Sequence, residues 1–396
     1  MTVPTHVAQL TPVGRGAVAT VAVEGPDAVN AVRQCLRRKS GATYGDLPIR
    51  RICVGVWHVP AEVANREAAG EELVVCRVSQ ERVEVHCHGG QAAVEAVIGS
   101  LESLGCRRCT WPEWMQNSTG LPGRTEIASA LAEARTQRVA AILLDQLQGA
   151  QLRTLRIVQQ NLDDGATEAA LQELEQLRQS ADVGLHLIDP WQVALVGRPN
   201  VGKSSLINAM LGFERAIVFD QPGTTRDLVV ATTAIDGWPV QFADTAGIRD
   251  QADELEAAGI ERAEAHLRQC DLVLLIDDVE STEHDRFPAI PEGLPCLKVI
   301  NKVDLNAPPP HALFDIATSV VTGEGIELLL SRVISTLVPS PPPEGAAVLF
   351  DRRQIAAIDA LISSVQNESL PLAVQQCRRL VEEQALLVEA SQNCEV

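Results

Sequence analysis

The sequence predicts a small α+β domain, then a helical domain, with a doubly wound α/β domain inserted within the helical one. Short apolar runs alternate with glycine turns over residues 1–112, as in α+β folds. A helical domain is predicted over residues 113–185 and 345–396, because alanine, leucine, glutamine and glutamate dominate residues 125–179 and a last helical stretch runs over 350–389. Over residues 186–338 apolar strands alternate with helical stretches, the pattern of a doubly wound sheet.

Composition indicates folded domains in a reducing compartment. The chain has 396 residues, 46% of them hydrophobic, enough for two to three domains of roughly 150 residues. A net charge of -19 disfavours a large basic groove, and five Trp, one Tyr and six Phe disfavour a base-stacking surface. Ten cysteines are too sparse for a disulfide scaffold, and we find no signal peptide and no apolar run of ~18 residues. We therefore expect a cytoplasmic protein that does not enter a membrane.

The first domain is expected to combine strands and two helices. Its predicted strands are 18–23, 52–59, 73–78 and 82–87, and its predicted helices are 28–36 and 91–104. A loop is expected over 111–123, because proline and glycine recur there.

The helical domain is predicted in two parts that flank the α/β domain. Over 125–179 the pattern is helical except at Asp163, Asp164 and Gly165, which predicts two long helices. The strands predicted in the α/β domain are 193–196, 228–235, 240–243, 272–277, 296–301 and 314–317. A proline-rich linker over 339–343 then leads to a last helical stretch over 350–389.

A phosphate-binding loop follows the first of these strands. The run from Gly197 to Ser204 fits G-x-x-x-x-G-K-[ST] and precedes a helical stretch. The glycines let successive N–H groups point at phosphate oxygens, and the helix N-terminus favours negative charge. We expect Lys203 to reach the β- and γ-phosphates and Ser204 to ligate Mg²⁺. The residues expected at the nucleotide here are Asn200, Val201, Gly202, Lys203, Ser204 and Ser205.

Two further motifs end later strands and predict GTP as the nucleotide. Asp244-Thr245-Ala246-Gly247 places an aspartate near Mg²⁺ and a backbone N–H near the γ-phosphate. In Asn301-Lys302-Val303-Asp304 the last carboxylate can accept both N–H groups of guanine, a donor pair that adenine lacks. Ser319 lies where a final base-contacting loop is expected. Thr225, between the first two motifs, is placed to ligate Mg²⁺ when a γ-phosphate is bound, as in nucleotide switches.

With these motifs, the run from Gly197 to Gly325 resembles the G domain of the MnmE (TrmE) family of tRNA-modification GTPases, as a divergent member. The other stretches that resemble this family are Gly14-Arg15-Gly16, Gly25-Pro26-Asp27, the run from Glu84 to Gly90, and Gly259-Ile260-Glu261-Arg262. The position of the G domain between two helical blocks is also similar.

The resemblance implies a P-loop GTPase domain and, over residues 1–112, a folate-binding-like dimerisation domain. It implies a homodimer through the N-terminal domains, and GTP hydrolysis that potassium stimulates without an arginine finger. With a MnmG-like flavoprotein as partner, such a protein modifies the wobble uridine of certain tRNAs. The implied cofactors are Mg²⁺, K⁺ and formyl-tetrahydrofolate.

The resemblance also assigns roles around the phosphates. Asn200 resembles the family's potassium-ligating asparagine, and the potassium ligands expected with it are Phe219, Gln221 and Thr224. A cation there neutralises the charge that develops during hydrolysis. Glu256 matches the family's catalytic glutamate, which orients the attacking water. From the residues alone, two alternatives stay open: Asn200 could only stabilise a turn, and Glu256 could belong to a solvated helix face.

The resemblance is weakest at the one-carbon site. Ala22 stands where the family has an arginine, and the chain ends Asn393-Cys394-Glu395-Val396 without the family's glycine and lysine. Of the folate-contacting side chains, only Glu84 is retained. One carboxylate anchor contributes about 1.5–3 kcal/mol, far below the roughly 8 kcal/mol of micromolar binding. We therefore expect formyl-tetrahydrofolate to bind weakly or not at all.

Three functions stay open at this point. The first is a potassium-stimulated GTPase of tRNA wobble-uridine modification. The second is a ribosome-assembly GTPase, although no basic G-x-x-G module follows the G domain. The third is a GTP-dependent dimerising scaffold that has lost the one-carbon chemistry and still organises a partner.

Overall fold

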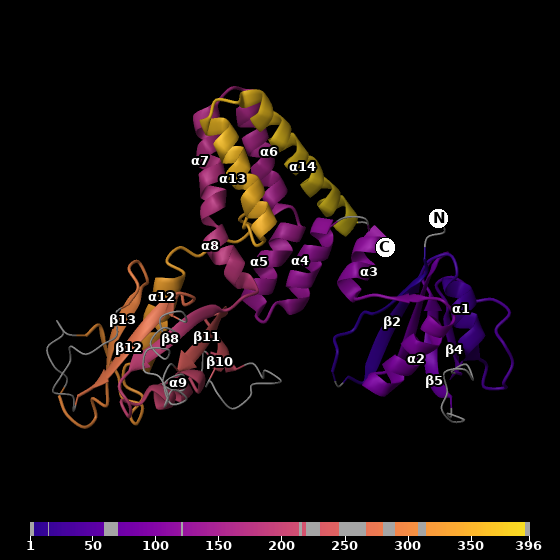
Figure 1. The fold of residues 1–396 in the computed structure, drawn as a ribbon, viewed down its shortest axis with the longest axis horizontal. Helices are drawn as coiled ribbons and strands as arrows, with labels where there is room; N and C mark the ends of the chain where they lie inside the picture. Colours follow the sequence, from indigo (N-terminus) through magenta and orange to yellow (C-terminus); the bar gives the residue numbers. More distant parts are fainter. Residues whose placement is uncertain are drawn as a thin grey trace, which may run out of the picture. The chain divides into compact units, whose positions relative to one another are not determined.

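The structure is a computed structural model, and it describes residues 4–14, 16–58, 70–119, 122–213, 216–218, 230–244, 267–279, 290–307 and 314–392 (Figure 1). The chain divides into two compact units, Met1–Ser129 and Ala130–Val396. Each unit contains one mixed sheet.

The first unit is built on a sheet with the strand order β3-β4-β5-β6-β2-β1-β7. The strands are β1 (His6–Gln9), β2 (Val18–Glu24), β3 (Leu36–Arg37), β4 (Ile52–Trp57), β5 (Glu71–Arg77), β6 (Arg82–His88) and β7 (Arg107–Arg108). The helices are α1 (Ala28–Cys35), α2 (Gln91–Ser103) and α3 (Trp111–Thr119). The predicted strands and the first two predicted helices are confirmed, each to within a few residues.

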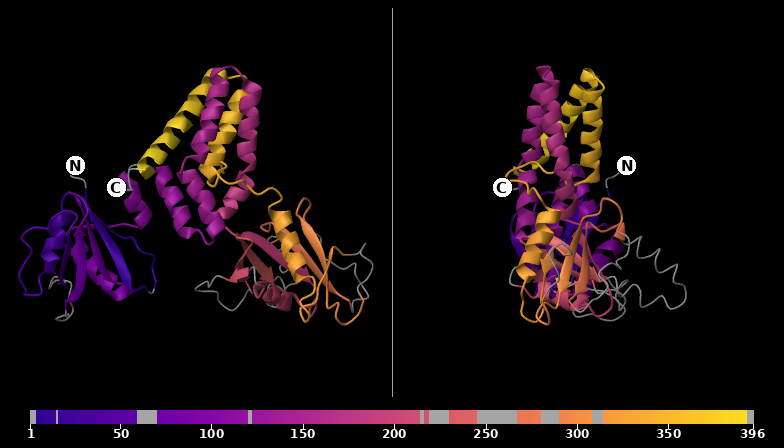
Figure 2. Two further views of the ribbon diagram at one scale, coloured as in Figure 1. Left: turned by 180° about the vertical axis from the view of Figure 1, so that it is seen from behind. Right: turned by 90° about the vertical axis from the view of Figure 1, so that its left-hand side faces the viewer.

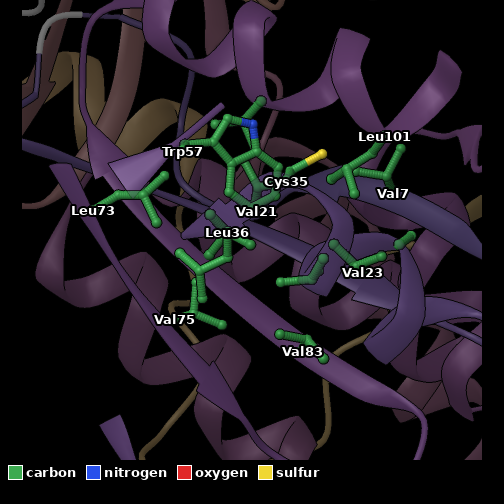
Figure 3. Packing of buried hydrophobic residues seen from close by; sticks show 14 of the residues in the cluster. Val7, Val21, Val23, Cys35, Leu36, Trp57, Leu73, Val75, Val83 and Leu101 are labelled. Atoms are coloured by element: carbon green, nitrogen blue, oxygen red, sulfur yellow. The ribbon is translucent and has the colours of Figure 1, made fainter. Parts of the chain in front are cut away.

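The core of this unit lies on one face of the sheet (Figure 3). Alternate residues of the strands point into it, including Val21 and Val23 of β2 and Val83 and Val85 of β6, all fully buried. The indole N–H of Trp57 donates to Ser100 Oγ on α2 at 2.9 Å, so the largest core side chain leaves no unpaired donor.

The opposite face of the sheet carries α3, where a loop was expected. Trp114 of this helix packs against Ala8 and Ala22, which are both fully buried. Pro112 did not prevent the helix because it stands in the first turn, where a backbone N–H has no helical partner anyway. The compact unit therefore extends beyond residue 112.

The second unit begins with helices α4 (Pro122–Glu133, shared with the first unit), α5 (Gln137–Leu147), α6 (Ala150–Asp163), α7 (Thr167–Gln179) and α8 (Ala181–Gly184), and a 3-10 turn η1 (Leu185–Leu187). The predicted break at Asp163 is confirmed, but the first predicted helix is three helices. Thr136 caps α5 by accepting from Val139 N at 3.2 Å, and Gly149 ends that segment with a φ of 90°.

Helices from both ends of this unit share one hydrophobic core. The late helices are α13 (Arg352–Gln366) and α14 (Leu370–Gln392). Leu155 and Leu174 pack in the same cluster as Leu361 and Cys377, and all are buried. In both views of Figure 2 the magenta helices α6 and α7 lie beside the yellow helices α13 and α14.

Buried glutamines fix the segment that precedes α13. Gln146 of α5 donates to Ala346 O at 3.0 Å and accepts from Val348 N at 3.0 Å. Gln151 of α6 donates to Val348 O at 2.7 Å. Because both side chains are 3% exposed, these hydrogen bonds are shielded from water.

The α/β part of this unit has the strand order β14-β13-β12-β8-β11-β10-β9. Its strands are β8 (Trp191–Gly197), β9 (Ala216–Val218), β10 (Val230–Ile235), β11 (Trp238–Asp244), β12 (Leu272–Asp278), β13 (Cys296–Asn301) and β14 (Ile316–Ala317). Its helices include α9 (Lys203–Leu211) and α12 (Ile326–Leu337). The six predicted strands are present, and β9 is an additional one.

The central strands are parallel and buried on both faces. Every residue of β12 is buried, and β8 pairs with β12 and β11 in parallel. Such strands read as continuous apolar runs, which is why the sequence located them well. Their carboxyl ends share one edge of the sheet, and ligands of such folds bind there. Among the helices described, none is long and apolar enough to cross a bilayer.

Candidate nucleotide site

The phosphate loop joins β8 to α9 at the carboxyl edge of the sheet. Asn200 and Gly202 have left-handed backbones, with φ of 66° and 94°. A Cβ on Gly202 would lie 2.5 Å from Asn301 Nδ2. This position therefore favours glycine for two reasons, its left-handed backbone and the lack of space for a side chain. The loop therefore has the tight curve that the motif predicted.

Lys203 lies at the start of α9 with its ammonium turned back over the loop. Its Nζ donates to Gly197 O at 3.1 Å and to Arg198 O at 2.9 Å, and the residue is only 5% exposed. A buried ammonium among carbonyl groups and helix N–H groups forms a positive site suited to phosphate.

Ser204 and Asp244 meet across the sheet edge. Ser204 Oγ donates to Asp244 Oδ2 at 2.7 Å, and Asp244 is 5% exposed at the end of β11. A hydroxyl and a carboxylate in contact beside a phosphate loop are hard oxygen ligands of the kind that Mg²⁺ prefers.

Asn301 links the end of β13 to the phosphate loop. Its Nδ2 donates to Val201 O at 3.0 Å, and its Oδ1 accepts from Thr318 Oγ1 at 3.2 Å. The residue is 2% exposed, so both hydrogen bonds are protected from water. The asparagine of the guanine motif thus holds two loops together.

Asp304 is exposed and lies beside the last loop. Ser319 Oγ donates to Asp304 Oδ1 at 2.5 Å, and it accepts from Thr322 N at 3.2 Å. The hydroxyl fixes one carboxylate oxygen and therefore the direction of the whole carboxylate. Lys302, between Asn301 and Asp304, has a left-handed φ of 64°.

Two acids at the end of β12 were not among the residues predicted for the site. Arg198 Nη2 lies 2.8 Å from Asp277 Oδ1, and Lys302 Nζ lies 2.7 Å from Asp278 Oδ2. In the sequence they are visible only as an acidic pair at the end of an apolar run, and no motif spacing links them to Arg198 or Lys302.

Several predicted site residues lie outside the described part of the chain. They are Phe219, Gln221, Thr224, Thr225, Thr245, Ala246, Gly247 and Glu256. The structure brings together the other predicted nucleotide residues, from Asn200 to Ser205 with Asp244, Asn301, Lys302, Asp304 and Ser319, at one edge of the sheet.

Glu84 lies in the first unit, on the face of the sheet that carries α3. Its Oε1 accepts from Arg82 Nη2 at 2.5 Å, and its Oε2 is 3.8 Å from His86 Nε2. The Arg82 guanidinium lies 4.6 Å from the ring centroid of Trp114. The carboxylate is thus already engaged by a cation of its own strand.

Three features meet at one edge of a doubly wound sheet: a phosphate loop, an aspartate at the end of β11 and a guanine motif. They define the class of the protein. The chain contains a P-loop GTPase domain and is a GTP hydrolase. The family model for the 50S ribosome-binding GTPase matches residues 192–302. The model for the GTP-binding protein TrmE N-terminus matches residues 5–117.

Curated relatives identify the family. The chain is 35% identical to the tRNA modification GTPase MnmE of Synechococcus sp. (strain CC9311), over 81% of this chain and 78% of that one. It is 31% identical to MnmE of Methylococcus capsulatus (strain ATCC 33009 / NCIMB 11132 / Bath), over 94% of this chain and 90% of that one. Among solved structures, it is similar to the G domain of the T. maritima FeoB iron transporter, at 25% identity and a TM-score of 0.27, over 37% of this chain and 98% of that one. The chain belongs to the MnmE family.

Proposed function

We propose that this protein is a potassium-stimulated GTPase that acts in the modification of tRNA wobble uridines in the cytoplasm. The observation that carries the proposal is the contact of Asn301 with Val201, which joins the guanine motif to the phosphate loop in one site. The relatives' name, tRNA modification GTPase, supports the biological role.

In this proposal the described residues bind and orient GTP. The N–H groups from Asn200 to Ser205 and the ammonium of Lys203 hold the phosphates. Asp304, oriented by Ser319, accepts the two N–H groups of guanine. Outside the described residues, Glu256 is proposed to orient the attacking water and Gly247 to contribute an N–H to the γ-phosphate.

Mg²⁺ fits Ser204 and Asp244, whereas K⁺ is proposed from Asn200 together with residues outside the described part of the chain. Ser204 would ligate Mg²⁺ with Thr225, and Asp244 would hold it through water, because Ser204 and Asp244 are already in contact. Asn200 is exposed in the phosphate loop and would ligate K⁺ with Phe219, Gln221 and Thr224. K⁺ supplies positive charge beside the phosphates as they separate.

Formyl-tetrahydrofolate does not fit the residues present as they are arranged. Glu84 would have to accept from a pterin, but Arg82 already occupies one of its oxygens. Ala22, in the place of the family's arginine, is fully buried. We propose that the first unit keeps a folate-binding-like fold and binds this cofactor weakly or not at all. Equilibrium dialysis that gives a low micromolar Kd would refute this.

The proposed partners are a second copy of the chain, a MnmG-like flavoprotein and tRNA. Homodimerisation through the first unit is supported by β4, whose Ile52 and Val54 are 73% and 46% exposed. The helical domain would hold the GTPase domain as an insertion, because helices on both sides of it share a core.

Two measurements test the proposal. Mass spectrometry of tRNA from a deletion strain should show unmodified wobble uridines, and a normal modification profile would refute the tRNA role. Titration calorimetry should show binding of GTP and GDP but not ATP. Asp304→Asn should weaken GDP binding by about 1.5–3 kcal/mol, through loss of a charge-assisted pair.

A second candidate function is a GTP-dependent dimerising scaffold without one-carbon chemistry. The engagement of Glu84 by Arg82 favours it specifically. The deletion strain separates the two, because loss of a scaffold that takes no part in tRNA modification would leave the wobble uridines modified.

A further inference from the structure

Two adjacent acids end the central strand β12 beneath the nucleotide site. The side chains of Asp277 and Asp278 are 8% and 10% exposed. Two neighbouring buried carboxylates are costly unless cations and hydrogen bonds compensate them. Asp277 Oδ1 also accepts from Asp278 N at 3.0 Å, so its orientation is fixed by the backbone.

The compensating cations come from two different parts of the site. Arg198, in the phosphate loop, is 2.8 Å from Asp277, and the same Nη2 is 4.0 Å from Asp278 Oδ1. Lys302, in the guanine motif, is 2.7 Å from Asp278 Oδ2. The four charges therefore alternate, and Arg198 lies within reach of both acids.

We propose that Asp277 and Asp278 are positioning residues that couple the phosphate loop to the guanine motif. Lys302 holds a left-handed φ of 64°, a conformation that a lysine keeps only when its surroundings stabilise it. The contact with Asp278 provides such stabilisation, and it sets the backbone two residues before Asp304. This inference rests on the proposed assignment of Asp304 to guanine.

The coupling follows from competition for Asp278. If Asp277 loses its charge, Arg198 gains most by turning to Asp278, which is already within 4.0 Å. Asp278 is then shared between two cations, and its hold on Lys302 weakens. Guanine selectivity should therefore depend on Asp277, an acid whose cation belongs to the phosphate loop and not to the guanine motif.

The test compares GDP with inosine diphosphate, which lacks the 2-amino group of guanine. Calorimetry on the full chain gives the ratio of the two Kd values for the wild type and for Asp277→Asn. We expect the preference for GDP to fall about 3- to 10-fold in Asp277→Asn, which lies in the lower part of the range of coupling energies between residues of one network. Asp277→Glu, which keeps the charge, should restore part of the preference.

A matched control uses the aspartate that immediately precedes β14, the strand next to β13. Asp315 accepts from Lys298 N at 2.8 Å, remote from the motif at the end of β13. Asp315→Asn should leave the preference unchanged. If Asp277→Asn fails to fold, Asp278→Asn serves instead, because it removes the contact with Lys302 directly and the preference for GDP should fall as well.

The coupling is overturned if the variant weakens both nucleotides by the same factor or changes neither. A wild-type protein with no preference for GDP over inosine diphosphate overturns the guanine assignment and the coupling with it. Since these results differ in the wild type, the two failures are distinguishable.

Discussion

Replacing Gly202 with alanine tests how tightly the phosphate loop and the guanine motif are joined. The new Cβ would lie 2.5 Å from Asn301 Nδ2, and the backbone φ is 94°. A left-handed alanine costs about 1–2 kcal/mol. Displacement of the Asn301 amide leaves the buried Val201 carbonyl unpaired, for about 1–3 kcal/mol more. The free energy of unfolding of the α/β part should therefore fall by about 2–5 kcal/mol.

Two other glycines separate the two contributions. Gly293 has a φ of 83° with no atom within 4 Å of its added Cβ, so Gly293→Ala should show the backbone strain alone. Gly212, at the end of α9, has a φ of -80°, and its nearest contact is Asn208 O at 3.3 Å. Gly212→Ala, which has neither a left-handed backbone nor a contact under 3.0 Å, should therefore cost less than Gly202→Ala.

The measurement is hydrogen exchange of peptides from β8 and α9 over a urea series, without nucleotide. It reports on the α/β part in a chain with several cooperative units. If Gly202→Ala loses no more free energy than Gly293→Ala, the contact with Asn301 does not constrain the loop, and the reasoning is refuted.

Four further outcomes are expected. Gln146→Leu should lower the free energy of unfolding of the helices by about 2–5 kcal/mol, because Ala346 O and Val348 N lose their buried partner; near-native exchange in α5 would contradict this. Burial raises the pKa of Cys377 to about 11, above its unfolded value of 9.0. The protonated thiol therefore stabilises the fold below pH 9, and this contribution is lost as the pH rises from 9 to 11. Fast alkylation of Cys377 at pH 8 would refute its burial. Asn200→Ala should abolish the rise in turnover when K⁺ replaces Na⁺, and a rise that persists in this variant would show that Asn200 is not a potassium ligand. Glu256→Ala should lower turnover ~10²–10⁴-fold with an unchanged GDP Kd, and normal turnover would return this residue to a solvated face.

The strands were the part of the fold most accessible from sequence. β13 was predicted with its observed bounds because it is a bounded apolar run. β9 was missed because a three-residue strand carries no periodicity. α3 was missed because Pro112 was taken as a breaker, although proline suits a first helical turn. The split of the first long helix at Gly149 depended on a positive φ that a lone glycine in a helical pattern does not reveal.

The nucleotide site was predictable where a motif carries it. The spacing of the motifs predicted that Lys203, Ser204 and Asn301 lie together at one edge of the sheet, because such motifs fix the residue types and their order. The contact of Arg198 with Asp277 was not predictable, because these residues are 79 positions apart in the sequence and only the strand order brings them together. The cation that engages Glu84 was missed for another reason. Two residues along one strand share a face, but nothing in the sequence says which of them pair.

The shared core of the helical domain has a consequence for synthesis of the protein. Leu155 and Leu174 emerge from the ribosome with α6 and α7, but Leu361, which packs with them, lies beyond the whole α/β part. At ~5–20 residues per second, the apolar faces of the first helices stay uncovered for about 10 s or more. During that delay the α/β part can complete its own sheet. The nascent helices, rather than the GTPase domain, are then the segment most exposed to aggregation and most in need of a chaperone.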